Sequence, residues 1–158
     1  LAPAAGYILT ILRYANVYGP RQDGRGEAGV VGIWMNRLLS GQDTVVNGDG
    51  RQTRDFVHVA DVVAANQAAF LHRAPGIFNV GTGVDLTIRE LAQLVGQVVY
   101  PEAELRFDPA KPDGAPRKCL DSSVITTLGW RARVPLEEGL RLAYSDFLQS
   151  DVCELRGR

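Results

Sequence analysis

The feature that most restricts the fold is an uninterrupted apolar segment near the start of the chain, residues 7–13, with the sequence YILTILR. It contains β-branched residues and shows no alternation of apolar and polar positions. A strand with this pattern is typically buried on both faces, as in a parallel sheet that is covered by helices on each side. The segment therefore predicts one strand of a parallel sheet.

Helix-like and strand-like segments alternate along the rest of the chain. Apolar residues at helical spacing, ended by Gly41 in one case and by Pro75 in another, mark the helices. Thr87 and Glu90 match a capping box, in which the two side chains satisfy free amides of a first helical turn. The alternation places the chain in the α/β class. We predict helices at residues 30–39, 59–73, 88–99 and 136–148, and short strands at residues 44–47, 56–59, 77–80 and 104–107.

Two polar segments, residues 16–29 and 108–118, are rich in glycine or proline and are predicted as loops. The first contains Gly24, Gly26 and Gly29 in a G-x-G-x-x-G arrangement, followed by a predicted helix. A dinucleotide-binding fingerprint begins directly at the end of a strand, whereas the strand here ends about ten residues earlier. The motif is therefore not interpreted as a cofactor loop, although the amides at the start of the following helix can hold an anion.

Composition limits the classes of function. The chain has 158 residues, 46% of them hydrophobic, and a formal net charge of -1, so it has no overall positive field for nucleic acid. Its apolar runs are too short or too interrupted to span a bilayer, and we expect no membrane partner. Cys119 and Cys153 have neither metal-ligand spacing nor a catalytic neighbour, which predicts no metal site and favours a cytoplasmic protein. Because the sequence starts at Leu1 without methionine and soon enters a strand, we expect a piece of a longer protein.

The segment most suggestive of function is residues 48–63, GDGRQTRDFVHVADVV. Gly48 and Gly50 supply a tight turn, since glycine reaches positive φ without a Cβ clash. Arg54 lies between that turn and the apolar strand that follows. A guanidinium keeps its charge at any working pH and offers a planar set of donors that suits phosphate oxygens. Arg54 is therefore either a phosphate ligand or the partner of Asp55 or of another carboxylate.

Other polar residues are candidates for the same site. Asn16 follows the first strand, and an amide at such a place fixes either the loop or a ligand. Lys111 and Arg117 belong to a basic loop that is either solvated or placed across a cleft from Arg54, where it would hold a diphosphate from the other side. His58 lies in an alternating strand, which favours a structural role. No Ser/His/Asp, Cys/His or metal-ligand set is apparent in the sequence.

Several long segments resemble one family. Residues 12–22 (LRYANVYGPRQ), 26–39 and 48–63 resemble the nucleotide-sugar epimerases of the extended short-chain dehydrogenase/reductase (SDR) superfamily, UDP-glucose 4-epimerase-like proteins in particular. Residues 78–95 and 111–121 resemble GDP-L-fucose synthase more closely. The resemblance covers nearly the whole chain, with its motifs in the right order.

This resemblance implies a fold and a domain organisation. The chain would be the C-terminal portion of an extended SDR, a Rossmann-type α/β fold, and would lack most of the N-terminal dinucleotide-binding domain. Residues 1–25 would be the last part of the Rossmann core, and residues 26–158 the substrate-binding lobe. The family's catalytic serine or threonine and its Tyr-x-x-x-Lys pair would lie upstream, so no catalytic residue is expected in this chain.

The resemblance also implies binding roles. Tyr14 and Val17 match positions that border the nicotinamide of NAD, or of NADP if the protein is of the fucose-synthase type. Because the loop at residues 111–114 reads KPDG, either Lys111 or Arg117 would replace the family's second diphosphate-binding arginine. The residues that match positions along the substrate, from its diphosphate to its base, are Asn16, Val30, Val31, Thr44, Val45, Asn47 and Arg54.

We therefore expect the nucleotide-sugar-binding portion of an NAD-dependent sugar-nucleotide epimerase, inactive on its own, with a UDP- or GDP-linked sugar as its partner. Two alternatives stay open: an epimerase/reductase like GDP-L-fucose synthase, and a non-catalytic nucleotide-binding module on the same scaffold. Because the strand at residues 7–13 would lack sheet neighbours, we also expect an exposed apolar edge and self-association into a homo-oligomer.

Overall fold

The computed structural model describes residues 7–23 and 29–149 of the chain. Strands and helices alternate, which confirms the predicted α/β class. In chain order the elements are β1 (Thr10–Tyr14), β2 (Asn16–Tyr18), α1 (Val30–Leu39), β3 (Thr44–Asn47), β4 (Thr53–His58), α2 (Val59–Leu71), β5 (Gly76–Val80), β6 (Asp85–Thr87), α3 (Ile88–Val99), β7 (Leu105–Asp108), β8 (Arg117–Lys118), α4 (Ser123–Thr126) and α5 (Leu136–Gln149).

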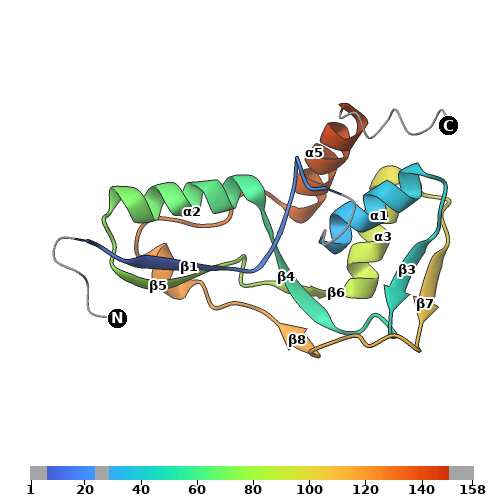
Figure 1. Ribbon diagram of the computed structural model, residues 1–158, viewed down its shortest axis with the longest axis horizontal. Helices are drawn as coiled ribbons and strands as arrows, with labels where there is room; N and C mark the ends of the chain where they lie inside the picture. The colour runs from blue at the N-terminus through green and yellow to red at the C-terminus, as the bar shows by residue number, and fades with distance from the viewer. Residues whose placement is uncertain (1–6, 24–28, 150–158) are drawn as a thin grey trace.

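One end of the molecule is a parallel strand pair with a helix lying along it (Figure 1). β1 pairs in parallel with β5, with Leu12 opposite Phe78. α2 packs against β1, and the short helix α4 packs against β5. Their apolar side chains form one of two cores, whose buried members are Val57, Val62, Ala65, Ala74, Phe78, Val80, Ile125 and Trp130.

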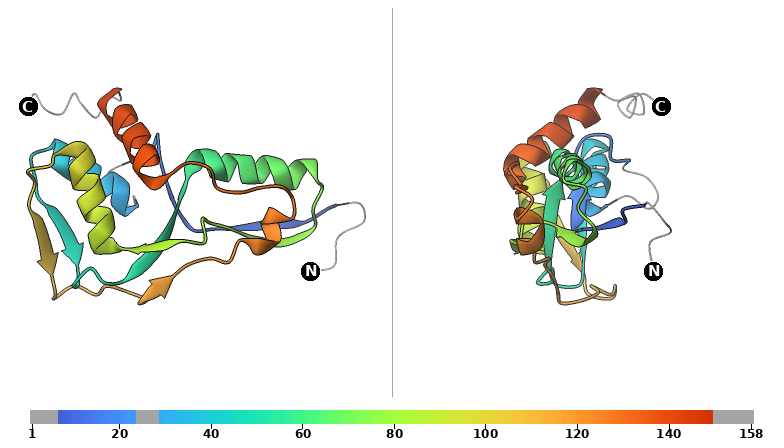
Figure 2. Two further views of the ribbon diagram at one scale, coloured as in Figure 1. Left: turned by 180° about the vertical axis from the view of Figure 1, so that it is seen from behind. Right: turned by 90° about the vertical axis from the view of Figure 1, so that its left-hand side faces the viewer.

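The opposite end is built from the helices α1, α3 and α5 and a second parallel strand pair, β3 and β7 (Figures 1 and 2). α3 packs against both α1 and α5, and the β3–β7 pair lies beside α3. The predicted capping box begins α3: the Thr87 hydroxyl accepts from the Glu90 amide at 3.1 Å, and the Glu90 carboxylate accepts from the Thr87 amide at 2.8 Å. The second core has Trp34, Met35, Leu91, Val95 and Leu140 among its members.

β4 joins the two ends. It pairs in parallel with β2, with Asn16 opposite Phe56, and antiparallel with β6, with Arg54 opposite Leu86. It also pairs in parallel with β8. The residues of β4 therefore lie at the junction of the two cores, which is where Arg54 is placed.

Three short strands are absent from the sequence-based prediction. β2 and β8 lie in segments predicted as loops, residues 16–29 and 108–118, and β6 was not predicted at all. Each of the three is two or three residues long and forms by pairing with β4. Such strands depend on partners distant in sequence rather than on their own propensity, so a local pattern does not indicate them.

β1 is not buried on both faces, so that part of the prediction is wrong for this chain. Within the described ranges, β1 pairs with β5 alone. Its segment is correspondingly open: the exposed fractions are 79% at Tyr7, 47% at Ile8, 50% at Leu9 and 40% at Ile11. The expectation of an exposed apolar edge is confirmed.

Candidate functional site

A pocket of about 340 Å³ lies where β2, β3, β4 and the starts of α1 and α3 meet the loop before β8. Among its lining residues are five that the family resemblance assigned to a nucleotide sugar: Asn16, Val30, Val45, Asn47 and Arg54. The other lining residues are Ile33, Trp34, Gln52, Phe56, Ile88, Pro112 and Asp113.

Arg54 is held in this pocket by backbone carbonyls. Its Nη1 donates to the carbonyls of Thr53 and Ala115, both at 2.7 Å, and its Nη2 donates to the carbonyl of Asp113 at 3.3 Å. No carboxylate of residues 7–23 and 29–149 lies within 4.0 Å of the guanidinium in an ion pair. The alternative that Arg54 merely pairs with Asp55 or with another carboxylate is therefore wrong for the described residues, and Arg54 lines the pocket without an ion-pair partner among them.

Asp55 is instead fully buried, and its side chain connects β4 to the turn after β5 through hydrogen bonds. Its carboxylate accepts from the amide and the hydroxyl of Thr82, at 3.0 and 2.6 Å, and from the amide of Gly83 at 3.2 Å. A Cβ on Gly81 would collide with this carboxylate. On the other side of the strand, Asn16 Nδ2 donates to the Asp55 carbonyl at 2.8 Å. These contacts fix Asn16 and Arg54 relative to one another.

The first turn of α1 supplies backbone donors. Its N-cap is Gly29, which has no side chain to satisfy the amides of Val30 and Val31, and no intrahelical acceptor exists for them either. Val30 lines the pocket, whereas the side chain of Val31 is buried in the core. Any role of Val31 is therefore limited to its amide. A helix start of this kind favours anions through its free N–H groups and its dipole.

Trp34, Val45, Asn47 and Gln52 line the β3 side of the pocket. Trp34 Nε1 donates to the Val45 carbonyl at 3.1 Å, which holds the indole against the strand. Gln52 Nε2 donates to the Asn47 carbonyl at 3.0 Å, which leaves the buried Gln52 Oε1 without a partner in the described part of the chain. Thr44 is buried and does not line the pocket, so the structure does not bring it into the site.

The basic loop does not form the expected clamp. Lys111 Nζ pairs with Asp108 at 3.5 Å. Arg117 makes a two-pronged pair with Asp85, at 2.8 Å from Nε and 2.9 Å from Nη2. Neither cation lines the Arg54 pocket, because both are held by acids along the loop and on β6. The predicted positions of Lys111 and Arg117 opposite Arg54 are therefore wrong in this structure.

The same ion pair controls the ionisation of Asp85. Hydrogen bonds from Arg117 and from the Thr53 hydroxyl hold the pKa of the Asp85 carboxyl well below its usual range.

In place of a cation, the loop before β8 brings Pro112 and Asp113 into the Arg54 pocket. The pocket thus combines one guanidinium, helix-start amides that no described side chain caps, the apolar side chains of Trp34 and Val45, and one carboxylate.

The sequence pattern and this geometry agree with a comparison against protein families. A model of the NAD dependent epimerase/dehydratase family matches residues 1–81. The chain belongs to this family. The matched residues include β2, β3, β4 and α1, which together supply most of the pocket.

Relatives of two kinds within the epimerase/dehydratase family are similar to the chain. A UDP-glucose 4-epimerase of Mycolicibacterium smegmatis is 45% identical over 128 residues, which cover 80% of this chain and 41% of that protein. GDP-L-fucose synthase 1 of Arabidopsis thaliana is 40% identical over 147 residues, covering 87% of this chain and 45% of that protein. The chain thus spans less than half the length of these curated relatives.

A solved structure confirms the fold. The UDP-glucose 4-epimerase of Thermotoga maritima, crystallised with UDP-glucose, superposes with a TM-score of 0.82 at 42% identity, covering 89% of this chain and 46% of that one. The chain therefore has the fold of the C-terminal part of an extended SDR epimerase. No helix within residues 7–23 and 29–149 is long and apolar enough to cross a membrane.

The expected nicotinamide neighbours lie outside the pocket. Tyr14 is half-exposed, and its hydroxyl donates to Asn66 Oδ1 at 3.1 Å. The Val17 carbonyl accepts from Gln22 Nε2 at 3.5 Å. β1 runs almost directly into β2, with only Ala15 between them and no glycine-rich turn. Gly24 and Gly26 of the G-x-G-x-x-G arrangement lie outside the described residues.

Sequence reasoning missed several residues of the pocket. Trp34 lies in the predicted helix at residues 30–39 and Phe56 in the predicted strand at residues 56–59, and the sequence assigns neither to a site. Their place in the pocket follows from the packing of α1 beside β3 and of β4 beside β2, which no local pattern shows. Gln52 could have been identified from the sequence, because its amide side chain lies between a glycine turn and a strand, two residues before Arg54.

Proposed function

We propose that this chain is the nucleotide-sugar-binding portion of an NAD-dependent nucleotide-sugar epimerase, an isomerase of the UDP-glucose 4-epimerase type. The observation that carries the proposal is Arg54, which shares a pocket with Asn16 and the start of α1 and has no acidic partner among the described residues. A guanidinium and free helix-start amides are complementary to a diphosphate. The UDP-glucose 4-epimerase relatives support the same conclusion.

In this proposal the ligand lies along the pocket. The diphosphate is held between Arg54 and the amides of Val30 and Val31. The planar base lies against Trp34 and Val45, near Asn47. Asp113 provides an acceptor for hydroxyl donors of the ribose.

The residues of this chain would anchor the ligand rather than perform the chemistry. When bound, NAD supplies a hydride acceptor and donor, and the solved Thermus thermophilus relative, a UDP-glucose 4-epimerase 38% identical to the chain, is a complex with NAD. Tyr14 and Val17 would border the nicotinamide, with residues 1–25 ending the dinucleotide-binding domain and residues 26–158 forming the substrate lobe. Strong diphosphate contacts let the sugar turn while the ligand stays bound.

The test is the affinity of the chain for UDP-glucose by titration calorimetry. Arg54→Ala should weaken binding by about 1.5–3 kcal/mol, because it removes a charged hydrogen-bond partner of the phosphates. The matched control is Arg51→Ala, since Arg51 is exposed, pairs with Asp49 at 3.3 Å and does not line the pocket. A loss below about 0.5 kcal/mol for Arg54→Ala would remove Arg54 from the site. The chain alone should bind without turnover, because no catalytic Tyr-x-x-x-Lys pair is expected in it.

A second candidate is the epimerase/reductase reaction of a GDP-L-fucose synthase, which would use NADPH. It is favoured by the 40% identity to the Arabidopsis thaliana enzyme. Titration with UDP-glucose and with a GDP-linked sugar in parallel separates the two, because the base contacts the Trp34 side of the same pocket. A non-catalytic nucleotide-binding module would bind a nucleotide sugar equally well, but the protein that carries it would lack the catalytic tyrosine and lysine.

A further inference from the structure

The segment between β7 and β8, residues 109–116, borders the Arg54 pocket, and we call it the strap. Pro112 and Asp113 of the strap line the pocket. Every strap residue is exposed, and none belongs to either apolar core. Burial of apolar surface therefore does not hold the strap in place, so its position depends on hydrogen bonds and on the elements at its two ends.

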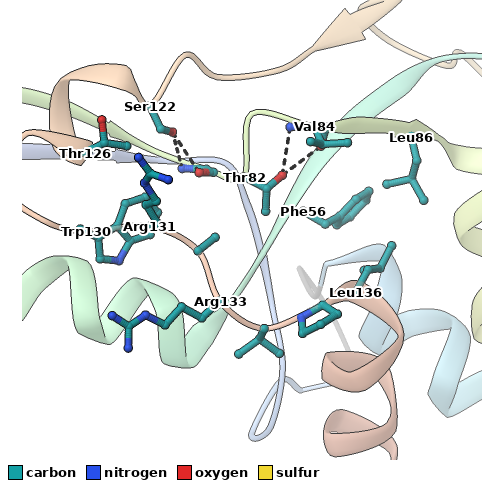
Figure 3. A pocket seen from close by; sticks show the side chains of 14 residues that line it. Phe56, Thr82, Val84, Leu86, Ser122, Thr126, Trp130, Arg131, Arg133 and Leu136 are labelled. Atoms are coloured by element: carbon teal, nitrogen blue, oxygen red, sulfur yellow. Dashed lines mark hydrogen bonds between the residues drawn. The ribbon is translucent and has the colours of Figure 1, made fainter.

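Both ends of the strap are anchored to the rest of the fold. Before it, β7 pairs with β3. After it, the Thr53 amide donates to the Pro116 carbonyl at 2.9 Å, and β8 pairs with β4. Farther along the chain, the Ser122 hydroxyl accepts from the Gly81 amide at 2.9 Å and donates to the Gly81 carbonyl at 3.0 Å. Figure 3 shows these two bonds at the wall of a separate hollow of about 550 Å³, to which no strap residue contributes.

The middle of the strap is held by Arg54. Among the hydrogen bonds between described residues, those that reach residues 112–115 come from its guanidinium: Nη1 donates to the Ala115 carbonyl at 2.7 Å, and Nη2 donates to the Asp113 carbonyl at 3.3 Å. Asp113 also packs closely on the turn before β4, since a Cβ on Gly48 would lie 2.7 Å from the Asp113 Cβ. Arg54 therefore fixes the strap, and with it the Asp113 side chain, at the edge of the pocket.

The strap meets Arg54 through a residue in the left-handed region. Gly114 lies between the two carbonyl groups that Arg54 contacts, and its φ is +74°. A Cβ on Gly114 would lie 3.4 Å from Arg54 Nη2. Glycine adopts this φ without a Cβ clash, whereas other residues are strained there. The contact between the strap and the guanidinium thus depends on the backbone freedom of Gly114.

Arg54 keeps donors for a ligand while it holds the strap. Its three bonds to carbonyl groups take both hydrogens of Nη1 and one hydrogen of Nη2. The Nε hydrogen and the second Nη2 hydrogen remain. Nε and Nη2 are the nitrogens with which Arg117 binds the Asp85 carboxylate, so this pair suits an anion with two oxygens. One side chain can therefore contact the strap and a phosphate at the same time.

We propose that Arg54 is a positioning residue as well as a phosphate ligand: it holds the strap against the nucleotide-sugar pocket, and the strap and the bound ligand stabilise one another. The identity of the ligand rests on the function proposed above. A nucleotide sugar in the pocket contacts Pro112 and Asp113 only while the strap is held there. By linkage, a change that releases the strap weakens binding, and binding makes release of the strap rarer.

A substitution in the strap that keeps the ligand-binding side chains tests this coupling. Gly114→Ala strains the strap at a φ of +74° and leaves Arg54 and Asn16 in the chain. We expect its Kd for UDP-glucose, measured by titration calorimetry, to rise roughly fivefold or more, in the range of typical coupling between sites. An unchanged Kd overturns the proposal.

Gly129→Ala is the matched control for backbone strain. Gly129 has a φ of +75°, a Cβ there would meet nothing within 4 Å, and the residue lies outside the strap and the Arg54 pocket. Its Kd for UDP-glucose should equal that of the parent chain. A loss of affinity as large as that of Gly114→Ala would show that general strain, rather than the strap, weakens binding.

Limited digestion with trypsin measures the positioning role without a ligand. The bond between Arg117 and Lys118 directly follows the strap, whereas the bond after Lys111 resists trypsin because proline follows it. Arg54→Ala should raise the cleavage rate of the Arg117–Lys118 bond roughly tenfold, as quantified by mass spectrometry, because the released strap is more often open to the protease. Gly114→Ala should raise this rate as well.

Arg51→Ala is the control for the digestion, because it also removes an exposed arginine but leaves the strap contacts intact. It should be cleaved at the parent rate. Equal rates in Arg54→Ala and Arg51→Ala would contradict the positioning role. In the parent chain, saturating UDP-glucose should slow cleavage of the same bond, and an unchanged rate would contradict the coupling.

The failure of this proposal and the failure of the proposed function give different results. If UDP-glucose does not bind the parent chain, the proposed function fails, while faster cleavage in Arg54→Ala still supports the role of Arg54 in holding the strap. If UDP-glucose binds the parent chain and Gly114→Ala equally well, the coupling is wrong and the proposed function stands.

Discussion

Arg54 and Arg117 carry the same side chain but have different partners. Both were candidates for a diphosphate ligand on the basis of the sequence. Arg54 donates to three backbone carbonyls, which orient the guanidinium without neutralising it. Arg117 is neutralised by Asp85 through two hydrogen bonds. The surroundings of each guanidinium therefore decide whether its charge is available to a ligand.

This difference leads to a prediction for Arg117→Ala. Its affinity for UDP-glucose should stay within about twofold of the parent chain, in contrast to Arg54→Ala, because Arg117 does not line the pocket. Its melting temperature should be lower at neutral pH, because β8 loses its ion pair to β6. Calorimetry and thermal melts of the same samples check both points. A loss of affinity for UDP-glucose as large as that of Arg54→Ala would show that Arg117 contributes to the binding site.

The stability difference should also depend on pH. The Asp85 carboxyl has a pKa below its usual value in the fold, with Arg117 as the main cause. Its contribution is therefore complete above the ordinary pKa of aspartate, about 4, and is lost as the pH falls further. The gap in melting temperature between the parent chain and Arg117→Ala should narrow from neutral pH to about pH 3. A gap that stays constant would show that the lost contacts of Arg117 are not electrostatic.

Among the elements, those with local signals were predictable. The bounds of α1 coincide with the predicted helix at residues 30–39, which Gly41 follows with φ of +71°. α3 starts at its capping box and ends at Val99, as predicted. β2, β6 and β8 were not predictable, because β4 creates them by pairing with residues far away in the chain. Local chemistry determines helix ends, whereas tertiary pairing determines the shortest strands.

The candidate site divides in the same way. Asn16 and Arg54 could be named from the sequence, because each follows or precedes a recognisable strand. The absence of an Arg54–Asp55 ion pair could not be predicted from the sequence. It depends on the turn at Thr82 and Gly83, whose donors form hydrogen bonds with the Asp55 carboxylate. The ion pair between Lys111 and Asp108 likewise depends on the conformation of the loop, which the sequence does not show.

α2 is the element whose stability should respond to pH near neutrality. His58 is its N-cap, and the imidazole Nδ1 accepts from the Ala60 amide at 3.3 Å. Burial lowers the pKa of His58, and the carboxylates of Asp61 and Glu138 oppose that shift only in part. The unfolded chain therefore takes up a proton as the pH falls through about 6.5, while the folded chain resists it, and stability falls. This supports the structural role predicted for His58.

We therefore expect His58→Asn to unfold in urea with a smaller pH dependence between about pH 7 and pH 5 than the parent chain, because asparagine caps a helix without titrating there. The other histidine of the chain, His72, is the exposed C-cap of the same helix and provides the control. His72→Asn should keep the pH dependence of the parent chain. The opposite pattern, with the slope lost in His72→Asn, would exclude His58 as its source.

At the scale of the whole molecule, the two cores are joined through β4, which contributes Phe56 to one and Val57 to the other. The helical end buries Met35, Leu91 and Leu140 completely. At the other end, β1 has one unpaired edge within the described residues and exposes apolar side chains. Large exposed apolar surface next to a free strand edge favours association with another chain.

We therefore expect the chain, as it stands, to self-associate through β1, which sedimentation velocity over a range of concentrations would measure. Ile11→Lys places a charge on the open strand, where Ile11 is 40% exposed, and should shift the chain toward monomer because a charged edge opposes strand pairing. Leu142→Lys is the matched control: Leu142 is 46% exposed but lies on α5, away from β1 (Figure 1), and its substitution should leave association unchanged. A parent chain that stays monomeric at every concentration, or a shift equally large in both variants, would show that the β1 edge does not mediate association.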